Sequence, residues 1–471
     1  MLTLNDLLKG LKYIRPPGTN FVLSSAEIDS RECVPGALFF ALPGEHVDGH
    51  DFVADAFKRG ARLAIVDKDL PEDIAVLDLR KVDPYPKSFQ WQTPFAIRVE
   101  DTLLALQGIA KYWREQHVLN VVGITGSVGK STTKEVAAAV LEQRFRTLRN
   151  PGNLNNEIGL PLTLLNLNIK HECAVLEMGF YVPGEIKLLC DIAKPQIGVL
   201  TNIGTVHAER AGTQEAIVHG KAELVESLPE EGVAILNYDD PLVRRMAKKS
   251  KARVFYYGLD ERADLWADRV NGLGLEGISF RLHYRNEILH LKVPLIGRHS
   301  VHTALRSSAI GLILNLTWQE IVNGLRSGHT QLRLVAVRAK NGALVLDDTY
   351  NASPQSTLAA LNLLDEMSGH KIAVLGDMLE LGRYEEIGHQ MVGVRAAEVA
   401  DEIVTVGERA QMIAKAARST RFMKTMITEL ENSDQVVEFL NDRLSKNDVV
   451  LVKGSRGMRM DTIVAALEEH E

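Results

Sequence analysis

Apolar and polar residues alternate along this chain in patterns that predict helices and buried strands. Helical spacing of apolar residues in 101–116 predicts an amphipathic helix, and the continuous apolar run at 118–124 predicts a buried strand. A glycine-rich turn follows, and then a helix is predicted over 134–145. Strand-like runs recur at 173–179 and 197–204, with helical stretches between them. This alternation favours a parallel sheet.

The last part of the chain, from about residue 329, alternates more regularly still. We predict strands at 343–348, 371–377, 402–407 and 448–454, and helices at 356–367, 386–400, 409–418 and 461–470. Continuous apolar strands joined by helices are typical of a doubly wound sheet. Ser353 and Pro354 suit the cap and first position of a helix.

The first part of the chain mixes short elements. Strands are predicted at 37–42 and 62–67, and a helix at 51–61. A stretch rich in Pro and Gln, 82–95, indicates a loop at a domain edge.

Composition narrows the function classes. With 45% apolar and 24% charged residues, the chain has the composition of an ordinary globular protein. Its net charge of −7 means that it lacks the overall basic charge typical of nucleic-acid-binding proteins. Three cysteines without a C-x-x-C pair argue against a disulfide framework. The start, 1–15, predicts an amphipathic helix and not a signal peptide, and no apolar run reaches the length of about 18 residues typical of a membrane span. We therefore expect a cytoplasmic protein.

The strongest chemical signal is the segment 123–132, GITGSVGKST, between a buried strand and a helix. Backbone N–H groups of such a turn close around phosphate oxygens, and the helix N-terminus adds its dipole. Lys130 suits the β- and γ-phosphates, and the Ser131 hydroxyl suits Mg²⁺. Ile124 stands where the strict pattern has glycine, so this is the shorter form G-x-x-G-K-S. The segment 272–277 matches G-x-G-x-x-G but precedes a strand pattern, which predicts hairpin turns instead.

These features predict an α/β fold with three domains, as the length of 471 residues also suggests. We expect a small α/β domain over 1–98, a central P-loop α/β domain over 99–328, and a C-terminal doubly wound, Rossmann-like domain over 329–471.

Polar residues at strand ends mark candidate sites, because ligands of open α/β sheets lie beyond the carboxyl ends of strands. Glu177 ends one predicted strand, and Asn202 and His207 follow the next. A carboxylate there can hold Mg²⁺. Alone, His207 would more often be structural, but next to a phosphate loop and Glu177 we favour a functional role. The polar run 153–159 is typical of a helix cap, and could also clamp a substrate.

In the last block, polar segments end three predicted strands: 347–354, 376–382 and 453–456. Together they form a plausible wall of a site, whereas each alone is typical of a capped turn.

The segments TGSVGKST, LEMG, TNIGTVHAE and HGKAE, in this order, resemble the Mur ligase family of peptidoglycan amide ligases. NLNNEIGLPLTLL, DDTYNASP, GDMLELG and VLVKGSRGMRMD resemble the branch that uses D-alanyl-D-alanine (D-Ala-D-Ala). The stretch EIDSRECVPGALFFALPGEHVDGHDF resembles the UDP-sugar-binding domain of that branch. The resemblance covers nearly all of the chain.

The resemblance implies an ATP-dependent acid–amino-acid ligase of peptidoglycan synthesis, and hence of cell wall biogenesis, cell shape, the cell cycle and cell division. ATP would phosphorylate the terminal carboxylate of UDP-N-acetylmuramoyl-tripeptide (UDP-MurNAc-tripeptide), and the amine of D-Ala-D-Ala would displace phosphate to give the pentapeptide. The implied cofactors are ATP and two Mg²⁺ ions. We expect a monomer without nucleic-acid partners or membrane insertion.

The resemblance also implies site residues. For ATP they are Thr125, Gly126, Ser127, Val128, Gly129, Lys130, Ser131 and Thr132, with Arg333 and Asp348 at the ribose. For metal they are Ser131, Glu177, His207 and Lys221, the last as a carbamate formed with CO₂. Lys130, His207 and Lys221 would be catalytic. Ser30 and Arg31 would lie near the UDP-sugar, Asn155 and Asn156 near the substrate, and Asn351, Asp377, Glu380 and Ser455 near D-Ala-D-Ala.

The chain departs from the family in the segment that contacts adenine, usually G-x-H-N-x-x-N-A. Ser300 and Thr303 replace its two asparagines. Phe180-Tyr181-Val182 also stands where relatives usually carry a polar centre. Alternatives are a neighbouring Mur or folylpolyglutamate-type ligase, a P-loop kinase or GTPase, and an inactive relative that acts as a binding protein. A neighbouring Mur or folylpolyglutamate-type ligase is disfavoured by the segments DDTYNASP and GDMLELG. A P-loop kinase or GTPase is disfavoured by the short loop and the separate third domain.

Overall fold

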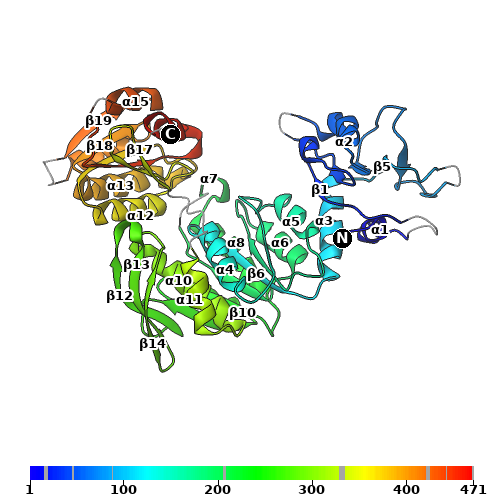
Figure 1. Ribbon diagram of the computed structural model, residues 1–471, viewed down its shortest axis with the longest axis horizontal. Helices are drawn as coiled ribbons and strands as arrows, with labels where there is room; N and C mark the ends of the chain where they lie inside the picture. Colours follow the sequence, from blue (N-terminus) through cyan, green and yellow to red (C-terminus); the bar gives the residue numbers. More distant parts are fainter. Residues whose placement is uncertain are drawn as a thin grey trace. The chain divides into compact units, whose positions relative to one another are not determined.

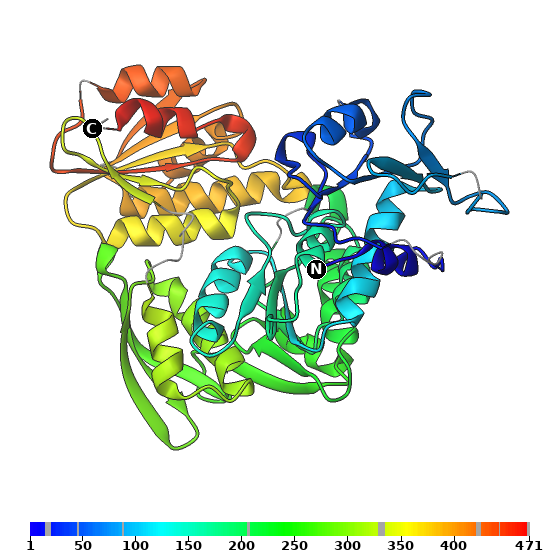
Figure 2. The ribbon, with the colours of Figure 1, turned by 45° about the vertical axis from the view of Figure 1, so that its right-hand side comes forward.

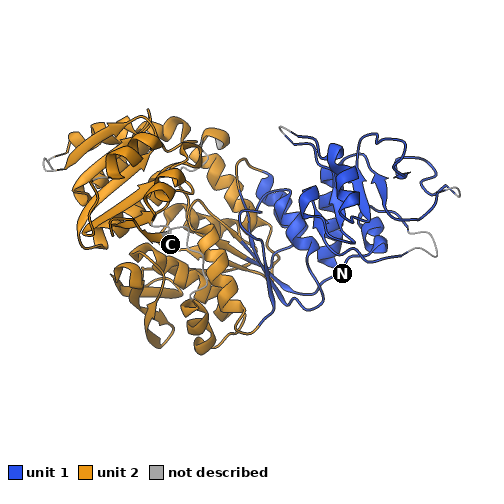
Figure 3. Ribbon diagram, turned by 45° about the horizontal axis from the view of Figure 1, so that its top comes forward, with its two compact units in different colours: residues 1–123, 145–179, 184–197 blue, residues 124–144, 180–183, 198–471 orange. Residues whose placement is uncertain are grey.

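The structure is a computed structural model that describes residues 1–14, 20–44, 47–86, 89–204, 208–327, 335–420, 425–441 and 443–468. The chain divides into two compact units, which we treat separately (Figure 3). Unit 1 comprises Met1–Gly123, Phe145–Gly179 and Gly184–Ile197, and unit 2 comprises Ile124–Arg144, Phe180–Pro183 and Gly198–Glu471. None of the described helices combines the length and apolarity that a membrane span requires.

The first part of unit 1 is built on a parallel five-stranded sheet with the strand order β1-β2-β3-β5-β4. Its elements are α1 (Leu4–Gly10), β1 (Ala26–Glu27), β2 (Leu38–Phe40), α2 (Val53–Lys58), β3 (Leu63–Val66), β4 (Val76–Asp78) and β5 (Phe95–Arg98). The fully buried Phe39 and Val53 belong to the core that joins α2 to the sheet. The N-terminal helix is shorter than predicted, and it begins with a capping box of Thr3 and Asp6.

The middle of the chain forms a nine-stranded sheet with the order β14-β13-β12-β11-β10-β9-β6-β8-β7. Its strands are β6 (Asn120–Thr125), β7 (Thr147–Arg149), β8 (Cys173–Glu177), β9 (Ile197–Leu200), β10 (Val233–Asn237), β11 (Arg253–Gly258), β12 (Leu265–Gly272), β13 (Ile278–Tyr284) and β14 (Glu287–Val293). β12, β13 and β14 pair in antiparallel fashion, which confirms that the segment 272–277 is a hairpin connection.

Helices in the middle of the chain are α3 (Thr102–Glu115), α4 (Lys130–Leu141), α5 (Gly159–Leu165), α6 (Glu185–Ala193), α7 (Ala208–Ala211), α8 (Gln214–Glu226), α9 (Pro241–Arg245), α10 (Val301–Ile313) and α11 (Trp318–Arg326). The Asp101 carboxylate accepts a hydrogen bond from the N–H of Leu104 at 2.7 Å, which explains why α3 begins where it does. α4 begins directly at Lys130, earlier than the apolar pattern predicted.

The last part of unit 2 is the predicted doubly wound domain, with the strand order β15-β16-β20-β17-β18-β19. Its elements are β15 (Val335–Arg338), β16 (Leu344–Asp347), α12 (Pro354–Glu366), β17 (His370–Gly376), α13 (Glu385–Val399), β18 (Glu402–Val406), α14 (Gln411–Arg418), β19 (Met426–Leu430), α15 (Ser433–Asn441), β20 (Asp448–Lys453) and α16 (Asp461–Leu467). β15 is antiparallel to β16, and the other pairs are parallel.

Two cores cover the two faces of this sheet. α12, α13 and α14 contribute buried residues to one core, and α15 and α16 contribute to the other. Figure 2 shows the yellow α12 and α13 on one side of the sheet and the orange and red α15 and α16 on the other. β15, β19 and α15 were not predicted. The side chains of β19 are intermediate or exposed, so this edge strand lacks the continuous apolar run of a buried strand.

We predict that Gly324→Ala destabilises the protein by about 1–3 kcal/mol, because it overpacks the contact between α11 and α4. A Cβ at Gly324 would lie 2.4 Å from the Val140 Cα and 2.9 Å from the Ala139 carbonyl oxygen, which are backbone atoms that cannot rotate away. Denaturant unfolding measures the change. Asn323→Ala, at the exposed neighbouring position, serves as the control, and equal stability of the two variants would contradict the prediction.

Candidate active site

The segment between β6 and α4 has the shape of a phosphate-binding loop (Figure 1). Gly129 immediately precedes the helix with φ +84°, and Gly126 has φ +144°. Both values lie where side chains with a Cβ are rare. At Gly126 a Cβ would lie only 1.9 Å from the Thr201 Oγ1, so the loop approaches the end of β9 closely. The loop thus leads directly into the N-terminus of α4, where backbone N–H groups and the helix dipole favour an anion.

The residues after β9 hold this loop from outside. The Asn202 Oδ1 accepts a hydrogen bond from the N–H of Val128 at 2.9 Å, and the Asn202 carbonyl accepts one from the N–H of Ser127 at 2.9 Å. The Ser127 Oγ in turn accepts from the N–H of Gly204 at 2.7 Å. Asn202, which the sequence placed at a strand end, thus fixes the shape of the loop.

Two lysines converge on one carbonyl of the loop. The Nζ of Lys130 donates to the Gly126 oxygen at 2.8 Å, and the Nζ of Lys221 donates to the same oxygen at 2.9 Å. Lys221 is buried on α8, and its Nζ lies 4.8 Å from the centre of the Phe180 ring. Burial, reinforced by the charge of Lys130, holds the pKa of Lys221 well below its usual range. A buried amine of this kind is a candidate for chemistry that needs the neutral form.

Glu177 forms a second polar centre, in unit 1, at the end of β8. Its Oε1 accepts a hydrogen bond from the Asn155 Nδ2 at 2.8 Å. Asn150, fully buried, pairs with the Glu177 backbone in both directions, at 2.9 and 3.0 Å. The side chain of Asn156 accepts from the N–H of Gly159 at 2.9 Å and so supports the start of α5. The asparagine-rich segment thus combines a polar turn at the start of α5, whose N-cap residue Ile158 makes no side-chain cap bond, with a contact to a buried carboxylate.

Glu177 has the properties of a cation ligand. It is 1% exposed, and its Oε2 is buried without a hydrogen-bond partner among the described residues. An unpaired buried carboxylate oxygen is costly unless a cation completes its coordination. Within the described chain no three His, Cys, Asp or Glu side chains form a metal cluster. His207, the fourth predicted metal residue beside Ser131, Glu177 and Lys221, lies outside the described residues, as does Arg333.

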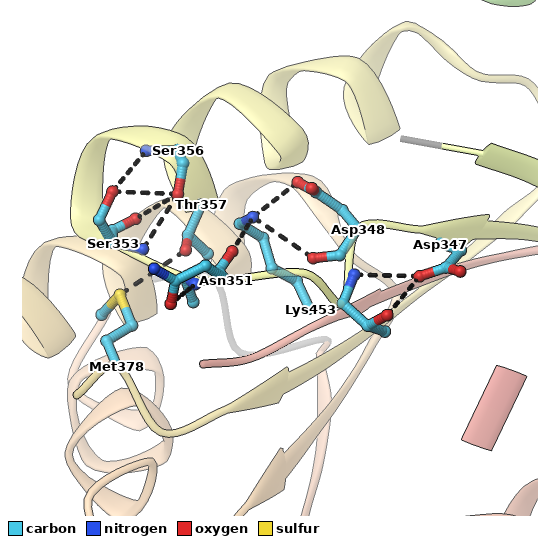
Figure 4. A network of polar contacts seen from close by, with 10 residues as sticks. Asp347, Asp348, Asn351, Ser353, Ser356, Thr357, Met378 and Lys453 are labelled. Atoms are coloured by element: carbon cyan, nitrogen blue, oxygen red, sulfur yellow. Dashed lines mark hydrogen bonds and ion pairs between the residues drawn. The ribbon is translucent and has the colours of Figure 1, made fainter. Parts of the chain in front are cut away.

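In the doubly wound domain, the ends of β16, β20 and β17 lie together, as predicted from their sequences (Figure 4). The buried Lys453 joins two of the polar segments. Its Nζ forms an ion pair with the Asp348 carboxylate at 2.6 Å and donates to the Asn351 carbonyl at 2.9 Å. The Ser353 Oγ accepts from the N–H of Ser356, which confirms the predicted cap of α12.

The third polar segment, after β17, is also tied down. The Asp377 Oδ1 accepts from the N–H of Ala410 at 2.7 Å, and the Ser455 Oγ accepts from the N–H of Leu379 at 2.8 Å. Glu380 has a φ of +62°, unusual for a residue with a Cβ. These bonds explain how residues at three strand ends form one continuous wall.

The two N-terminal candidates differ in exposure. Ser30 is buried, and its hydroxyl donates to the Asp55 carboxylate at 2.8 Å. The side chain of Arg31 is 78% exposed and pairs with Asp29 at 2.6 Å. Arg31 is therefore the one of the two that presents a charge to solvent.

Sequence reasoning missed several residues that hold the site. Asn150, His389 and Arg306 are buried polar residues in otherwise apolar or unremarkable segments. Asn150 precedes the polar run 153–159 by three positions, so that run was the signal that could have found it. His389 and Arg306 lie on helices whose apolar spacing gives no hint of their roles.

The phosphate loop and the polar strand ends of the six-stranded sheet together define a nucleotide-dependent α/β enzyme. Family models match in three places: the Mur ligase family catalytic domain at residues 23–114, the Mur ligase middle domain at 124–311, and the Mur ligase glutamate ligase domain at 332–456. The chain belongs to the Mur ligase family.

Individual relatives match over nearly the full length. The UDP-N-acetylmuramoyl-tripeptide–D-alanyl-D-alanine ligase of Bacillus subtilis (strain 168) is 34% identical, over 98% of this chain and 97% of the relative. A crystal structure of MurF from Acinetobacter baumannii has a TM-score of 0.84 at 31% identity, and covers 98% of this chain and 97% of its own. MurF from Thermotoga maritima in complex with ADP has a TM-score of 0.79 at 28% identity, over 94% of this chain and 96% of its own. These matches confirm the family and the three-part α/β architecture.

We predict a pH dependence of stability from His389, which is fully buried under the loop that follows β17. Its Nδ1 lies 2.7 Å from the Glu385 carbonyl, and its Nε2 accepts from the N–H of Met378 at 3.1 Å. Only the neutral ring fits both bonds, because Nε2 must stay unprotonated. Burial lowers the pKa of His389 below the usual value of a histidine.

The lowered pKa determines the direction in which stability changes with pH. The contribution of His389 is fully present above the unfolded-state pKa, and it is lost as pH falls from there through the lower folded-state pKa. Unfolding free energies at pH 8 and pH 5.5 should therefore differ less in His389→Gln than in the wild type. His290→Gln, at an exposed position on β14, is the control. An unchanged pH dependence in His389→Gln would disprove this role.

Proposed function

We propose that this protein joins D-Ala-D-Ala to UDP-MurNAc-tripeptide with consumption of ATP, giving UDP-MurNAc-pentapeptide for peptidoglycan synthesis. It is an ATP-dependent ligase that forms an amide bond. The observation that carries this function is the loop between β6 and α4, where Lys130 begins a helix directly after the left-handed Gly129, as in a phosphate-binding loop. Relatives that carry the name of this activity, over nearly the full length, support the substrates.

The chemistry proceeds in two balanced steps. A carboxylate oxygen of the tripeptide attacks the γ-phosphorus, and the bond from that phosphorus to ADP breaks. The amine of D-Ala-D-Ala then attacks the acyl carbon, loses a proton and expels phosphate. An anionic carboxylate must approach a polyanion in the first step, so the site has to offset their repulsion. Lys130 is in place to do so, since it can exchange its bond to Gly126 for the phosphates.

We propose that Ser131, Glu177, His207 and Lys221 hold Mg²⁺ ions. The orphaned Glu177 Oε2 supports this assignment, because a hard cation favours carboxylate oxygen. When bound, Mg²⁺ would neutralise phosphate charge and orient the triphosphate. Asn155 positions the Glu177 carboxylate by bonding to its other oxygen.

We propose further that Lys221 reacts with CO₂ to form a carbamate. The amine nitrogen attacks the carbon of CO₂ and loses a proton, which leaves an anionic group with two oxygens. The reacting form is the neutral amine, which the burial of Lys221 favours. An unmodified ammonium 4 Å from a cation would be repelled by about 4 kcal/mol per pair of unit charges at an effective dielectric near 20. A carbamate instead offers the oxygen ligands that Mg²⁺ prefers.

The remaining assignments follow the three predicted domains 1–98, 99–328 and 329–471. Ser30 and Arg31 would serve the UDP-sugar, Asn155 and Asn156 the tripeptide end, and Arg333 and Asp348 the ribose. Asn351, Asp377, Glu380 and Ser455 would line the D-Ala-D-Ala side. The ion pair of Asp348 with Lys453 supports a fixed carboxylate at the sheet edge. We propose that the protein acts as a cytoplasmic monomer.

We expect Lys130→Ala to reduce ligation by about 100-fold or more, because removal of one charge-stabilising donor typically has an effect of that size. Pentapeptide formation is the measurement, with circular dichroism to verify the fold. Lys170→Ala, at an exposed position, is the control. Near-normal turnover in a folded Lys130→Ala variant would sink the proposed function.

We expect Lys221→Ala to be inactive and to regain activity with added short carboxylates, which can replace the carbamate oxygens. Lys130→Ala is a matched control, since its ammonium bonds the same Gly126 carbonyl but should not be rescued. With ¹³C-labelled bicarbonate, the wild type should show a carbamate resonance that Lys221→Ala lacks. Full activity of untreated Lys221→Ala, or no such resonance in the wild type, would refute the carbamate.

A further inference from the structure

Arg306, on α10, is a buried cation behind the phosphate loop. It is 4% exposed, and no carboxylate of the described residues forms an ion pair with it. Burial lowers the pKa of the guanidinium, but arginine stays charged in proteins. A buried charge without a counter-charge is costly for the fold. We therefore ask which function a buried positive charge at this position could serve.

The guanidinium contacts the loop and the first turn of α4 directly. Its Nε donates to the Thr133 hydroxyl, and its Nη2 lies 3.3 Å from the Gly129 carbonyl oxygen. A Cβ at Gly129 would lie 2.6 Å from this Nη2, so Arg306 occupies the space beside the residue at which the loop turns into the helix. The planar fork thus fixes two points of one turn, which a lysine could not do.

Arg306 also links the loop to the rest of the central sheet. Its Nη2 donates to the Thr303 hydroxyl at 2.8 Å, and the side chain of Tyr257 is a further hydrogen-bond partner. The Tyr257 hydroxyl lies 3.0 Å from the Leu200 carbonyl oxygen and 3.1 Å from that of Thr201. β9 ends at Leu200, next to the residues that hold the other side of the loop. One buried network therefore reaches both sides of the phosphate loop.

The two positions at which this chain departs from the family belong to the same region. Thr303 accepts from Arg306, and the Ser300 hydroxyl donates to the Ile296 carbonyl at 2.6 Å. Both hydroxyls are thus engaged within the protein. In this chain the segment 297–304 supports the loop through Arg306.

We propose that Arg306 is a positioning residue, which locks the phosphate loop in its anion-binding shape and whose buried positive charge is compensated by the phosphates of the nucleotide. The proposal rests on ATP binding by the loop, as in the proposed function. Because the positive charge of Arg306 acts on phosphate groups, its loss should weaken the binding of ATP more than the binding of ADP. Because the fork acts through geometry, a lysine should restore only part of the binding.

The test measures the dissociation constants of ATP and ADP by calorimetry with Mg²⁺ present. We expect Arg306→Met to weaken ATP binding about tenfold or more, ADP binding less, and Arg306→Lys to lie between Arg306→Met and the wild type. In steady-state kinetics the KM for ATP should rise while the KM for D-Ala-D-Ala stays unchanged. Thr303→Val, which removes one acceptor of the fork, should weaken ATP binding in the same direction and is the reserve variant if Arg306→Met fails to fold.

Arg114 provides the matched control, because it is another buried arginine that bonds backbone carbonyls, those of Ala193 and His117. Arg114→Met should leave both dissociation constants within twofold of the wild type. A folded Arg306→Met with unchanged ATP affinity would overturn the proposal, and so would an equal loss for ADP and ATP. Lys130→Ala distinguishes failure of the Arg306 proposal from failure of the proposed function. If Lys130→Ala also binds ATP normally, the proposed function itself has failed.

Discussion

The arrangement of this protein depends on one electrostatic problem, which is to bring a carboxylate to a nucleotide triphosphate. Positive charge is gathered at a single turn of backbone to solve it. The Lys130 ammonium bonds the carbonyl of Gly126, and the Arg306 guanidinium bonds that of Gly129. Carbonyl oxygens hold these cations without neutralising them, whereas carboxylates would cancel the charge that the substrates need. Burial of Arg306 keeps water from screening its charge.

Close packing is what keeps such an arrangement in place. The loop can approach Thr201 only because residue 126 is glycine, and α4 can lie against α11 only because residue 324 is glycine. The side-chain amide of Asn202 then fixes the loop from the side of β9. The same holds for the six-stranded sheet of the C-terminal part, where the buried Lys453 and the partly exposed Asp348 hold two strand ends together through an ion pair.

Much of the fold could be predicted from the sequence, because continuous apolar strands and helical spacing are strong local signals. The doubly wound class of the last domain and the cap at Ser353 follow from such signals, and the loop before Lys130 follows from its glycine pattern. The edge strand β19 lacks the apolar run and could not be found in this way. Contacts between residues that are distant in sequence could not be predicted either. Arg306 and Gly129 are 177 positions apart, and only the packing of α10 against α4 brings them together.

The central claim, that this chain activates a carboxylate by phosphorylation at the Lys130 loop, is tested most directly by an oxygen label. UDP-MurNAc-tripeptide labelled with ¹⁸O in its terminal carboxylate is incubated with ATP and D-Ala-D-Ala, and the released phosphate is analysed by mass spectrometry. The account predicts one ¹⁸O atom per phosphate for each pentapeptide formed, because the attacking carboxylate oxygen leaves with phosphorus. Pentapeptide formed with unlabelled phosphate would contradict it.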